Sequence, residues 1–425
     1  MSAAARAGAV GIGVASLITG AGLRGQTLDV ERAATVLSGM PSRGSRTERV
    51  DVAQSGRAGD PLPASDLRVT WRGSAGGLLD QPPLVGAGAS PYAVTSQGEV
   101  VAFAADGTER WREATGIAQP GPAALLVDDT VVFATLSGEA VAVRRSGVRW
   151  RVRFARGDAV RPGPLPLPNG GVVVAAAREV VALDADGRER ARTSLPEPVS
   201  APLVAALGQV VAVTASGAVW GWVPSAAEPR RLGAFGASVE GGAALVDRSL
   251  VAVSNGGTRL VWVDLAGGTK TTRSPPSGAL WLGPAATHGV FTQVTLLAPG
   301  GELSVSLDAS GAELARVLLT PHAPQASGDG GGAIPSGPRA APLIDAHGTL
   351  AFVTADGGVG VVSSSGTLEL LADACVAPPE TPLAPGRSGG AVAGLAPLRP
   401  GEMLVACRSG ALLAVAGGKA VPARL

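Results

Sequence analysis

Few residues in this sequence have both a reactive side chain and a suggestive setting, and Ser388 is the first of them. It lies in the glycine-rich segment GRSGG (Gly386–Gly390), and a serine becomes a nucleophile when a histidine base and a carboxylate stand beside it. The three histidines, His288, His322 and His347, form no recognisable base motif. The segment also belongs to the proline-rich connection VAPPETPLAPGRSGG, so a loop is the favoured interpretation.

Metal and cofactor chemistry has equally little support in the residue pattern. The histidines are far apart and share no ligand spacing with the cysteines. The segment GIGVAS (Gly11–Ser16) lacks the strand and the acidic partner of a dinucleotide-binding fingerprint. Asp106, Asp184 and Asp186 lie in or beside turns, where aspartate bonds to the backbone. We therefore assign no catalytic, cofactor-binding or metal-binding residue and expect no cofactor.

Composition indicates what kind of elements the chain builds. With 61 Gly and 33 Pro in 425 residues, turns are frequent, which favours many short strands over long helices. Hydrophobic residues make up 46% and are mainly Ala, Val and Leu, which suit closely packed sheets. The net charge is +1, with basic and acidic residues spread along the chain, so the sequence offers no field that would hold nucleic acid.

The first 25 residues have the character of a targeting segment. A single early Arg6 precedes an uncharged run from Ala7 to Leu23, as in a secretory signal peptide. An uncleaved membrane anchor is the alternative, although glycines weaken the run. Residues 26–66 are polar and rich in Arg, Ser, Gly and Asp, and we interpret them as a linker. This organisation predicts an exported protein.

A repeat dominates the rest of the chain. The segments VVAFAADGTERW (Val100–Trp111), AVAVRRSGVRW (Ala140–Trp150) and VVALDADGRERA (Val180–Ala191) place turn glycines at 107, 147 and 187, which is a spacing of 40 residues. A fixed period between 20 and 50 residues marks a repeat architecture. Each segment predicts a strand, a tight turn and a second strand.

The full repeat contains four strands. In the fourth copy they are SAPLVAAL, QVVAVTA, AVWGWV and PRRLGAF, separated by turn residues. Eight such units can be written, which predicts an all-β, eight-bladed β-propeller of four-stranded antiparallel blades over residues 67–425. The extra strand LRVTWRG (Leu67–Gly73) precedes the first unit, and we expect it to pair with the last unit and close the ring.

Tryptophans mark the contacts expected between blades. Trp71, Trp111 and Trp150 recur at one place in the repeat, which argues for packing between blades rather than for a ligand site. Later units lose this tryptophan, and the third has Ala191 in its place. Trp222 and Trp262 lie on the third strand of their units and are candidates to replace it.

The two cysteines belong to neighbouring units. Cys375 ends the seventh unit and Cys407 lies on the second strand of the eighth. An oxidising compartment could join them, but strand register decides whether their Cα atoms approach closely enough. Two separate buried thiols are therefore an equally open interpretation.

The outer hairpins quoted above resemble the PQQ-like, or quinoprotein-type, propeller repeat, with its A-x-D-x-x-G-x-x-x-W pattern. The resemblance covers about residues 67–425 and is best kept in the first three units. The family contains enzymes that carry pyrroloquinoline quinone with calcium, often under a disulfide between adjacent cysteines, and non-catalytic scaffolds such as the lipoprotein of the outer-membrane barrel-assembly machinery. Cys375 and Cys407 are not adjacent and no quinone motif is present, so the resemblance points to the scaffold class.

The functional expectation is a non-catalytic scaffold of the bacterial cell envelope, a monomeric ring that binds a protein partner. The alternatives are a quinone- or sugar-dependent envelope enzyme with a degenerate site, or a sensor or ligand-binding propeller. The two longest connections, Thr320–Arg339 and Cys375–Gly390, join successive blades and should emerge side by side on one face. We expect them to form the partner-binding patch, with Arg339 and Arg387 as charged contacts. Membrane contact is expected only through an uncleaved N-terminal segment.

Overall fold

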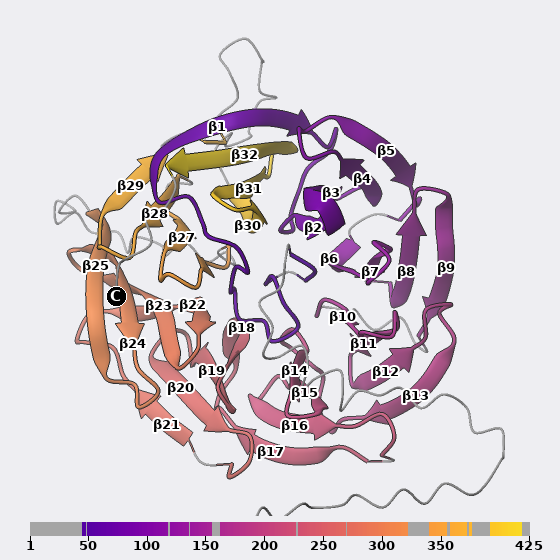
Figure 1. Cartoon of the computed structure of the whole chain (residues 1–425). Coiled ribbons are helices and arrows are strands. Elements are labelled where there is room, and N and C mark those ends of the chain that lie inside the picture. Colours follow the sequence, from indigo (N-terminus) through magenta and orange to yellow (C-terminus); the bar gives the residue numbers. More distant parts are fainter. Residues whose placement is uncertain are drawn as a thin grey trace, which may run out of the picture.

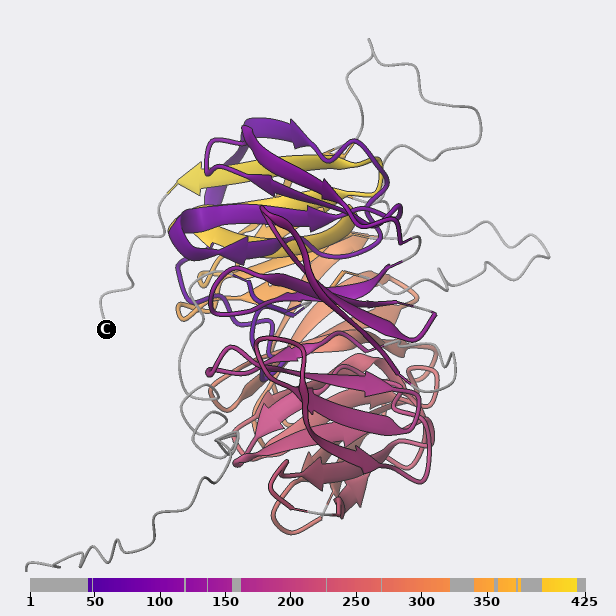
Figure 2. The same cartoon turned by 90° about the vertical axis from the view of Figure 1, so that its right-hand side faces the viewer.

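The chain folds into a ring of eight four-stranded antiparallel sheets around a central axis (Figure 1). The structure is a computed structural model, and it describes residues 45–47, 49–117, 120–135, 137–154, 162–226, 228–268, 270–321, 340–354, 358–371, 374–375 and 392–418. Seen from the side, the ring is a disc of stacked blades (Figure 2). The predicted eight-bladed all-β propeller is confirmed.

Within each blade the strands are called A to D from the channel outward. Blades 1 to 4 consist of β2 (Leu84–Gly86), β3 (Ser90–Val94), β4 (Glu99–Phe103) and β5 (Glu109–Ala114); β6 (Pro120–Leu125), β7 (Val131–Thr135), β8 (Glu139–Arg144) and β9 (Gly147–Arg153); β10 (Leu165–Pro166), β11 (Val172–Ala176), β12 (Glu179–Leu183) and β13 (Glu189–Ser194); and β14 (Val204–Ala206), β15 (Gln209–Val213), β16 (Ala218–Trp222) and β17 (Arg230–Ala234).

Blades 5 to 8 follow the same order, except that the last blade takes its D strand from the start of the chain. They consist of β18 (Val239–Val246), β19 (Ser249–Ser254), β20 (Arg259–Asp264) and β21 (Lys270–Arg273); β22 (Leu280–His288), β23 (Phe291–Ala298), β24 (Gly301–Leu307) and β25 (Glu313–Pro321); β26 (Leu343–Ile344), β27 (Leu350–Val353), β28 (Val359–Val362) and β29 (Leu368–Leu371); and β30 (Val392–Arg399), β31 (Glu402–Cys407), β32 (Ala411–Gly418) and β1 (Ser65–Ser74). A single 3₁₀ turn, η1 (Ala87–Ala89), joins β2 to β3.

The C-to-D turn of blade 3 shows why the repeat motif forms a hairpin. The Oδ1 atom of Asp184 accepts hydrogen bonds from the backbone N–H groups of Asp186 and Arg188, both at 2.9 Å. Gly187 has a φ of +78°, a conformation that favours glycine. The aspartate and the glycine therefore determine the turn together, and the strands on either side need only be apolar enough to pack.

Ring closure occurs as the sequence predicts. β1 pairs antiparallel with β32, and Trp71 lies opposite Ala414. The indigo β1 and the yellow β32 run side by side in both views, although they come from opposite ends of the sequence (Figures 1 and 2). Blade 8 thereby gains its fourth strand, so the two ends of the described ring are held by one sheet.

Packing between blades uses the predicted tryptophans. A Cβ atom added at Gly107 of blade 1 would lie 2.4 Å from the Trp71 ring, and one at Gly187 of blade 3 would lie 2.7 Å from the Trp150 ring. Each ring therefore covers the C-to-D turn of the next blade. Trp111 belongs to the cluster between blades 1 and 2, where it meets the Tyr92 ring edge-on with a centroid distance of 6.0 Å.

Two tryptophans on C strands, Trp222 and Trp262, pack between blades further along the ring. Trp262 is buried between blades 5 and 6, and a Cβ atom at Gly311 of blade 6 would lie 3.3 Å from its ring. Trp262 thus covers the turn of the next blade from a different strand. Trp222 is buried between blades 3 and 4, and its indole N–H donates to the backbone oxygen of Ala226 in its own turn.

Among the residues that the structure describes, the junction between blades 6 and 7 has the smallest buried apolar cluster. Its buried cluster has six members, Ala286, Leu319, Ile344, Leu350, Phe352 and Val362. The neighbouring cluster between blades 7 and 8 has sixteen, three of which come from residues before β1. At the 6–7 junction, blade 6 also carries a polar group, in which Ser306 donates to Gln293 at 2.5 Å and Gln293 donates to Ser304.

The described part of the expected linker does not behave as a free tether. Residues 45–47 and 49–64 lie inside the ring, where the indigo trace crosses the centre of Figure 1, and most of their side chains are buried. We call these residues the channel strap. β1 itself begins at Ser65, within the stretch expected to be linker. The polar composition of the strap is typical of a linker. Its polar residues can nevertheless be buried, because they find hydrogen-bond partners inside the channel.

Among the described residues, no helix is long and apolar enough to cross a membrane. The expected targeting segment, residues 1–25, lies outside the described residues.

Candidate functional site

The channel strap follows the inner strands around the ring. Its first residues form an antiparallel bridge between Ser45 and Val85 of blade 1. The backbone N–H of Leu125 in blade 2 then donates to the Arg46 oxygen at 2.8 Å. In blade 4, the N–H of Ala205 donates to the Val52 oxygen at 2.8 Å. Blade 3, between them, is contacted through the Val52 side chain, which packs in the cluster that includes Leu165 and Leu167.

The second half of the strap continues over blades 5 to 8. The backbone N–H groups of Leu245 and Thr287 donate to the oxygens of Ala53 and Ser55, at 3.0 and 2.8 Å. Ile344 donates to Gly56 and accepts from Ala58, and Gly401 donates to Pro61. These partners lie at or next to the end of each A strand, beside the A-to-B hairpin. The strap therefore lies within the channel at the face that carries the A-to-B hairpins.

Buried charges hold the middle of the strap. Asp51 accepts from the Ser55 backbone N–H at 2.9 Å and from the Ser55 hydroxyl at 2.5 Å. Arg49 is buried beside it and donates to the Ala285 oxygen of blade 6. Burial raises the pKa of Asp51, although the bonds from Ser55 and the charge of Arg49 oppose this shift. These polar groups are therefore built into the ring and are not displayed to solvent.

A histidine and a buried aspartate flank the strap at blades 6 and 7. The Asp345 carboxylate accepts from the Leu62 backbone N–H of the strap at 2.9 Å. Burial lowers the pKa of His288, and the nearby charge of Arg57 lowers it further, while Asp345 opposes the shift. The pKa of His288 is also lowered slightly by His347. The Nε2 atom of His288 is buried and has no hydrogen-bond partner among the described residues.

This corner does not make a metal site. Within the described ranges, no three His, Cys, Asp or Glu side chains come together in an arrangement that could hold a metal ion. The second carboxylate oxygen of Asp345 instead accepts hydrogen bonds from the backbone N–H groups of His347 and Thr349, both at 2.8 Å. His347 is exposed in a turn, whereas His288 is half-buried at the end of β22.

A groove on the outer side of the ring separates blades 3 and 4. It has a volume of about 670 Å³ and is lined by Arg192, Thr193, Ser194, Leu195, Pro196, Trp220, Glu228 and Pro229. Ala191 lies opposite Ala182 there, in the register that Trp111 and Trp150 have opposite Ala102 and Ala142. The small side chain replaces the outer tryptophan, and the Trp220 ring on β16 stays half-buried at the groove.

The groove has the chemistry of a shallow peptide site. Trp220 and Leu195 supply apolar surface, and Pro196 and Pro229 limit the movement of the walls. Arg192 is held by Glu189 at 2.5 Å and by Glu179, so its charge is already paired. Apolar surface beside an arginine whose charge is already paired suits a side chain of a protein partner better than it suits a small anionic substrate.

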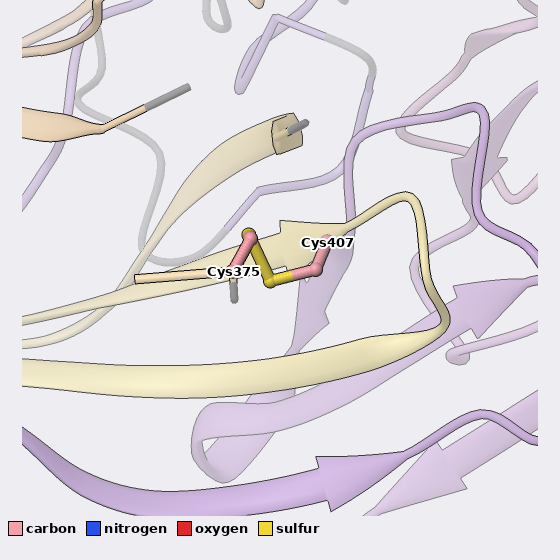
Figure 3. Close-up of a disulfide and its surroundings, with 2 residues drawn as sticks. All are labelled: Cys375 and Cys407. Carbon is pink, nitrogen blue, oxygen red and sulfur yellow. A yellow bond between two sulfur atoms is a disulfide. The ribbon is translucent and has the colours of Figure 1, made fainter. Parts of the chain in front are cut away.

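The two cysteines form a disulfide between blades 7 and 8 (Figure 3). Cys407 is on β31, Cys375 follows β29, and their Cα atoms are 5.3 Å apart. Of the two alternatives that the sequence left open, the structure therefore shows the disulfide. Its residues are separated by 32 positions, so it is a link between blades and not a bond between adjacent cysteines.

The predicted partner-binding patch is not described by the structure. Arg339, Arg387, Ser388 and His322 all lie outside the described residues. Sequence reasoning missed the strap and the groove. The substitution of Ala191 for the repeat tryptophan was a usable signal for the groove, whereas the strap left no pattern of side chains to detect.

Fold and site together define a closed β-propeller with a segment of its own chain in the channel. The outer hairpins of its first blades have the pattern of the PQQ-like propeller repeat. Residues 32–152 match the family described as outer membrane protein assembly factor BamB. This match includes the strap and the first two blades. No curated protein matches the sequence significantly.

Solved structures with the same fold come from functionally different proteins. BamB from Moraxella catarrhalis is similar over 84% of this chain and 99% of its own, with 16% identity and a TM-score of 0.59. Quinohemoprotein alcohol dehydrogenase from Comamonas testosteroni is similar over 93% of this chain and 84% of its own, with 12% identity and a TM-score of 0.62. The computationally designed protein Ika8 has 13% identity, a TM-score of 0.61, and coverage of 84% and 100%. At these identities the likeness shows the fold alone.

Proposed function

We propose that the protein is a non-catalytic scaffold of the bacterial cell envelope that holds a protein partner on the outside of a rigid ring. The observation that carries this proposal is the channel strap. Small ligands of propellers can bind at the central channel, and here a segment of the chain itself takes up space in that channel and uses the inner N–H groups of several blades. Binding surface is then offered mainly by the outer side and the opposite face.

Two further observations support this proposal. The family match over residues 32–152 is to an outer membrane protein assembly factor, and the disulfide between Cys375 and Cys407 suits an oxidising compartment such as the periplasm. An exported ring with a protein partner is consistent with both. The proposed contacts are the groove at Trp220 and the connections that contain Arg339 and Arg387.

The quinone-enzyme alternative has less support than the scaffold proposal. That class, by resemblance, uses calcium with acidic and amide ligands and often a disulfide between adjacent cysteines. The disulfide here joins two blades, and no metal-ligating cluster occurs in the described ranges. Reconstitution with pyrroloquinoline quinone and calcium tests the alternative directly. A stable visible cofactor spectrum after gel filtration would contradict the scaffold proposal.

The scaffold proposal is tested by crosslinking the protein to its partner in envelope extracts. We expect Trp220→Ala to reduce capture of the partner, because it removes the apolar surface of the groove. Leu207→Ala is the matched control, since Leu207 is 51% exposed on the same blade but lies at the A-to-B hairpin. A third variant replaces residues 322–339 and 376–391 with short Gly-Ser linkers. Undiminished capture by both the groove variant and the linker variant would refute the proposed contacts.

A further inference from the structure

The contacts of the channel strap are those of a bound peptide. Its carbonyl oxygens accept from the inner strands at Leu125, Ala205, Leu245 and Thr287. Bonds of this kind hold a backbone whatever its side chains. Between them the strap turns on itself, since Gln54 donates to the Asp51 oxygen and Gly56 donates to the Arg49 oxygen. The strap therefore binds the ring along its length, from blade 1 to blade 8, and does not merely pass through the channel.

Side chains of the strap fill places that the blades leave between them. Val52 packs between blades 3 and 4, and Ala53 packs between blades 4 and 5. Val50, Ala58 and Leu62 belong to the cluster between blades 7 and 8. Pockets for particular side chains, in addition to backbone bonds, are what makes a peptide site selective.

One residue of the strap must be small. Gly56 has a φ of +69°, and a Cβ atom there would lie 2.6 Å from the backbone oxygen of Pro342. Gly56 lies between Ser55, which accepts from blade 6, and Ala58, which donates to blade 7. The strap thus crosses the 6–7 junction in close contact with the backbone of the ring. Among the described residues, this junction has the smallest buried apolar cluster.

We propose that the channel mouth is a binding site for a turn-containing peptide and that the chain occupies this site with its own residues 45–64. The ligand class is a turn-forming segment, rich in polar residues and with small apolar residues between them, that contains an Arg-x-Asp sequence followed by a glycine, as in Arg49 to Gly56. The bound strap clamps blades 6 and 7 together. A segment from another protein with the same chemistry gains access only when the strap leaves.

The test keeps the full chain intact during folding. A protease site flanked by Gly-Ser is inserted between Ser65 and Asp66, where the pairing of β1 with β32 is irregular and Asp66 is exposed. After cleavage, the strap is held only by its non-covalent contacts. We expect the cut fragment to elute with the ring in gel filtration at micromolar concentration, and the Tm of the cut protein to rise with protein concentration.

Synthetic peptides provide the matched control. A fluorescent peptide of residues 45–64 should replace the cut fragment on the ring, and the fluorescence anisotropy of the peptide should then rise. The same peptide with Gly56→Val should not bind, because the added side chain meets the Pro342 oxygen. The peptide test also holds if the Gly56→Val protein fails to fold. Separation of the cut fragment from a ring that stays folded would overturn the proposal, and so would equal binding of the two peptides.

Discussion

The contact between Trp150 and the turn glycine of the next blade allows a sharp test of how blades are held together. Gly187 has a φ of +78°, and its missing Cβ would lie 2.7 Å from the Trp150 ring. The ring has little room to move, because it is 8% exposed and its N–H donates to the Ala185 oxygen at 3.0 Å. Gly187→Ala should therefore force apart two blades.

Gly366 supplies the matched control for this substitution. It occupies the C-to-D turn of blade 7 with a φ of +83°, and a Cβ atom there would meet nothing within 4 Å. A left-handed conformation costs a residue with a side chain about 1–2 kcal/mol, so Gly366→Ala should lose about that much stability. Gly187→Ala should lose about 1–3 kcal/mol more, because overpacking adds to the backbone cost.

Urea unfolding followed by circular dichroism measures both losses. A third variant, Trp150→Ala, should itself cost about 3–5 kcal/mol. Adding Gly187→Ala to it should then cost only about 1–2 kcal/mol, the backbone cost alone, which gives a coupling free energy of about 1–3 kcal/mol in a double-mutant cycle. Equal losses for Gly187→Ala and Gly366→Ala would refute the role assigned to the tryptophan.

Three further predictions concern the disulfide and two titratable groups, the buried Asp51 and the half-buried His288. Reduction of the Cys375–Cys407 bond should lower stability by about 3–4 kcal/mol, the value for a loop of this length, while a double Cys→Ala variant should not respond to reductant; two free thiols in the unfolded, unreduced protein would contradict the link. Because the folded pKa of Asp51 is raised, its contribution to stability is greatest below pH 3.8 and is lost as pH rises through the folded pKa. Wild-type stability relative to Asp51→Asn should therefore fall with rising pH in urea titrations, and a rise would contradict the burial argument. The folded pKa of His288 is lowered, so stability is lost as pH falls from 6.5 through that pKa, and His288→Phe should flatten this part of the profile.

The blades were predictable because each is a local structure. The segment VVALDADGRERA contains both strands of an outer hairpin, and Asp184 and Gly187 determine the turn between them through bonds that span two to four residues. Ring closure by the strand at Trp71 was also predictable. The last unit has only three strands of its own, and the strand at Trp71 precedes the first unit without a partner there, so pairing the two completes the ring. Information of this kind lies in adjacent residues and in the repeat period, and one sequence is enough to read it.

Other features were decided only by the tertiary structure. The sequence of residues 45–64 resembles a polar linker, but its backbone bonds join Arg46 to Leu125 and Pro61 to Gly401. Main-chain groups are the same in every residue, so bonds of this kind leave no mark in the sequence. The disulfide likewise depended on strand register, which brings the Cα atoms of Cys375 and Cys407 to 5.3 Å. The sequence by itself therefore determined the eight blades and their turns. The path of residues 45–64 through the channel was decided by the tertiary structure, because only the assembled ring places the inner N–H groups of different blades beside this segment.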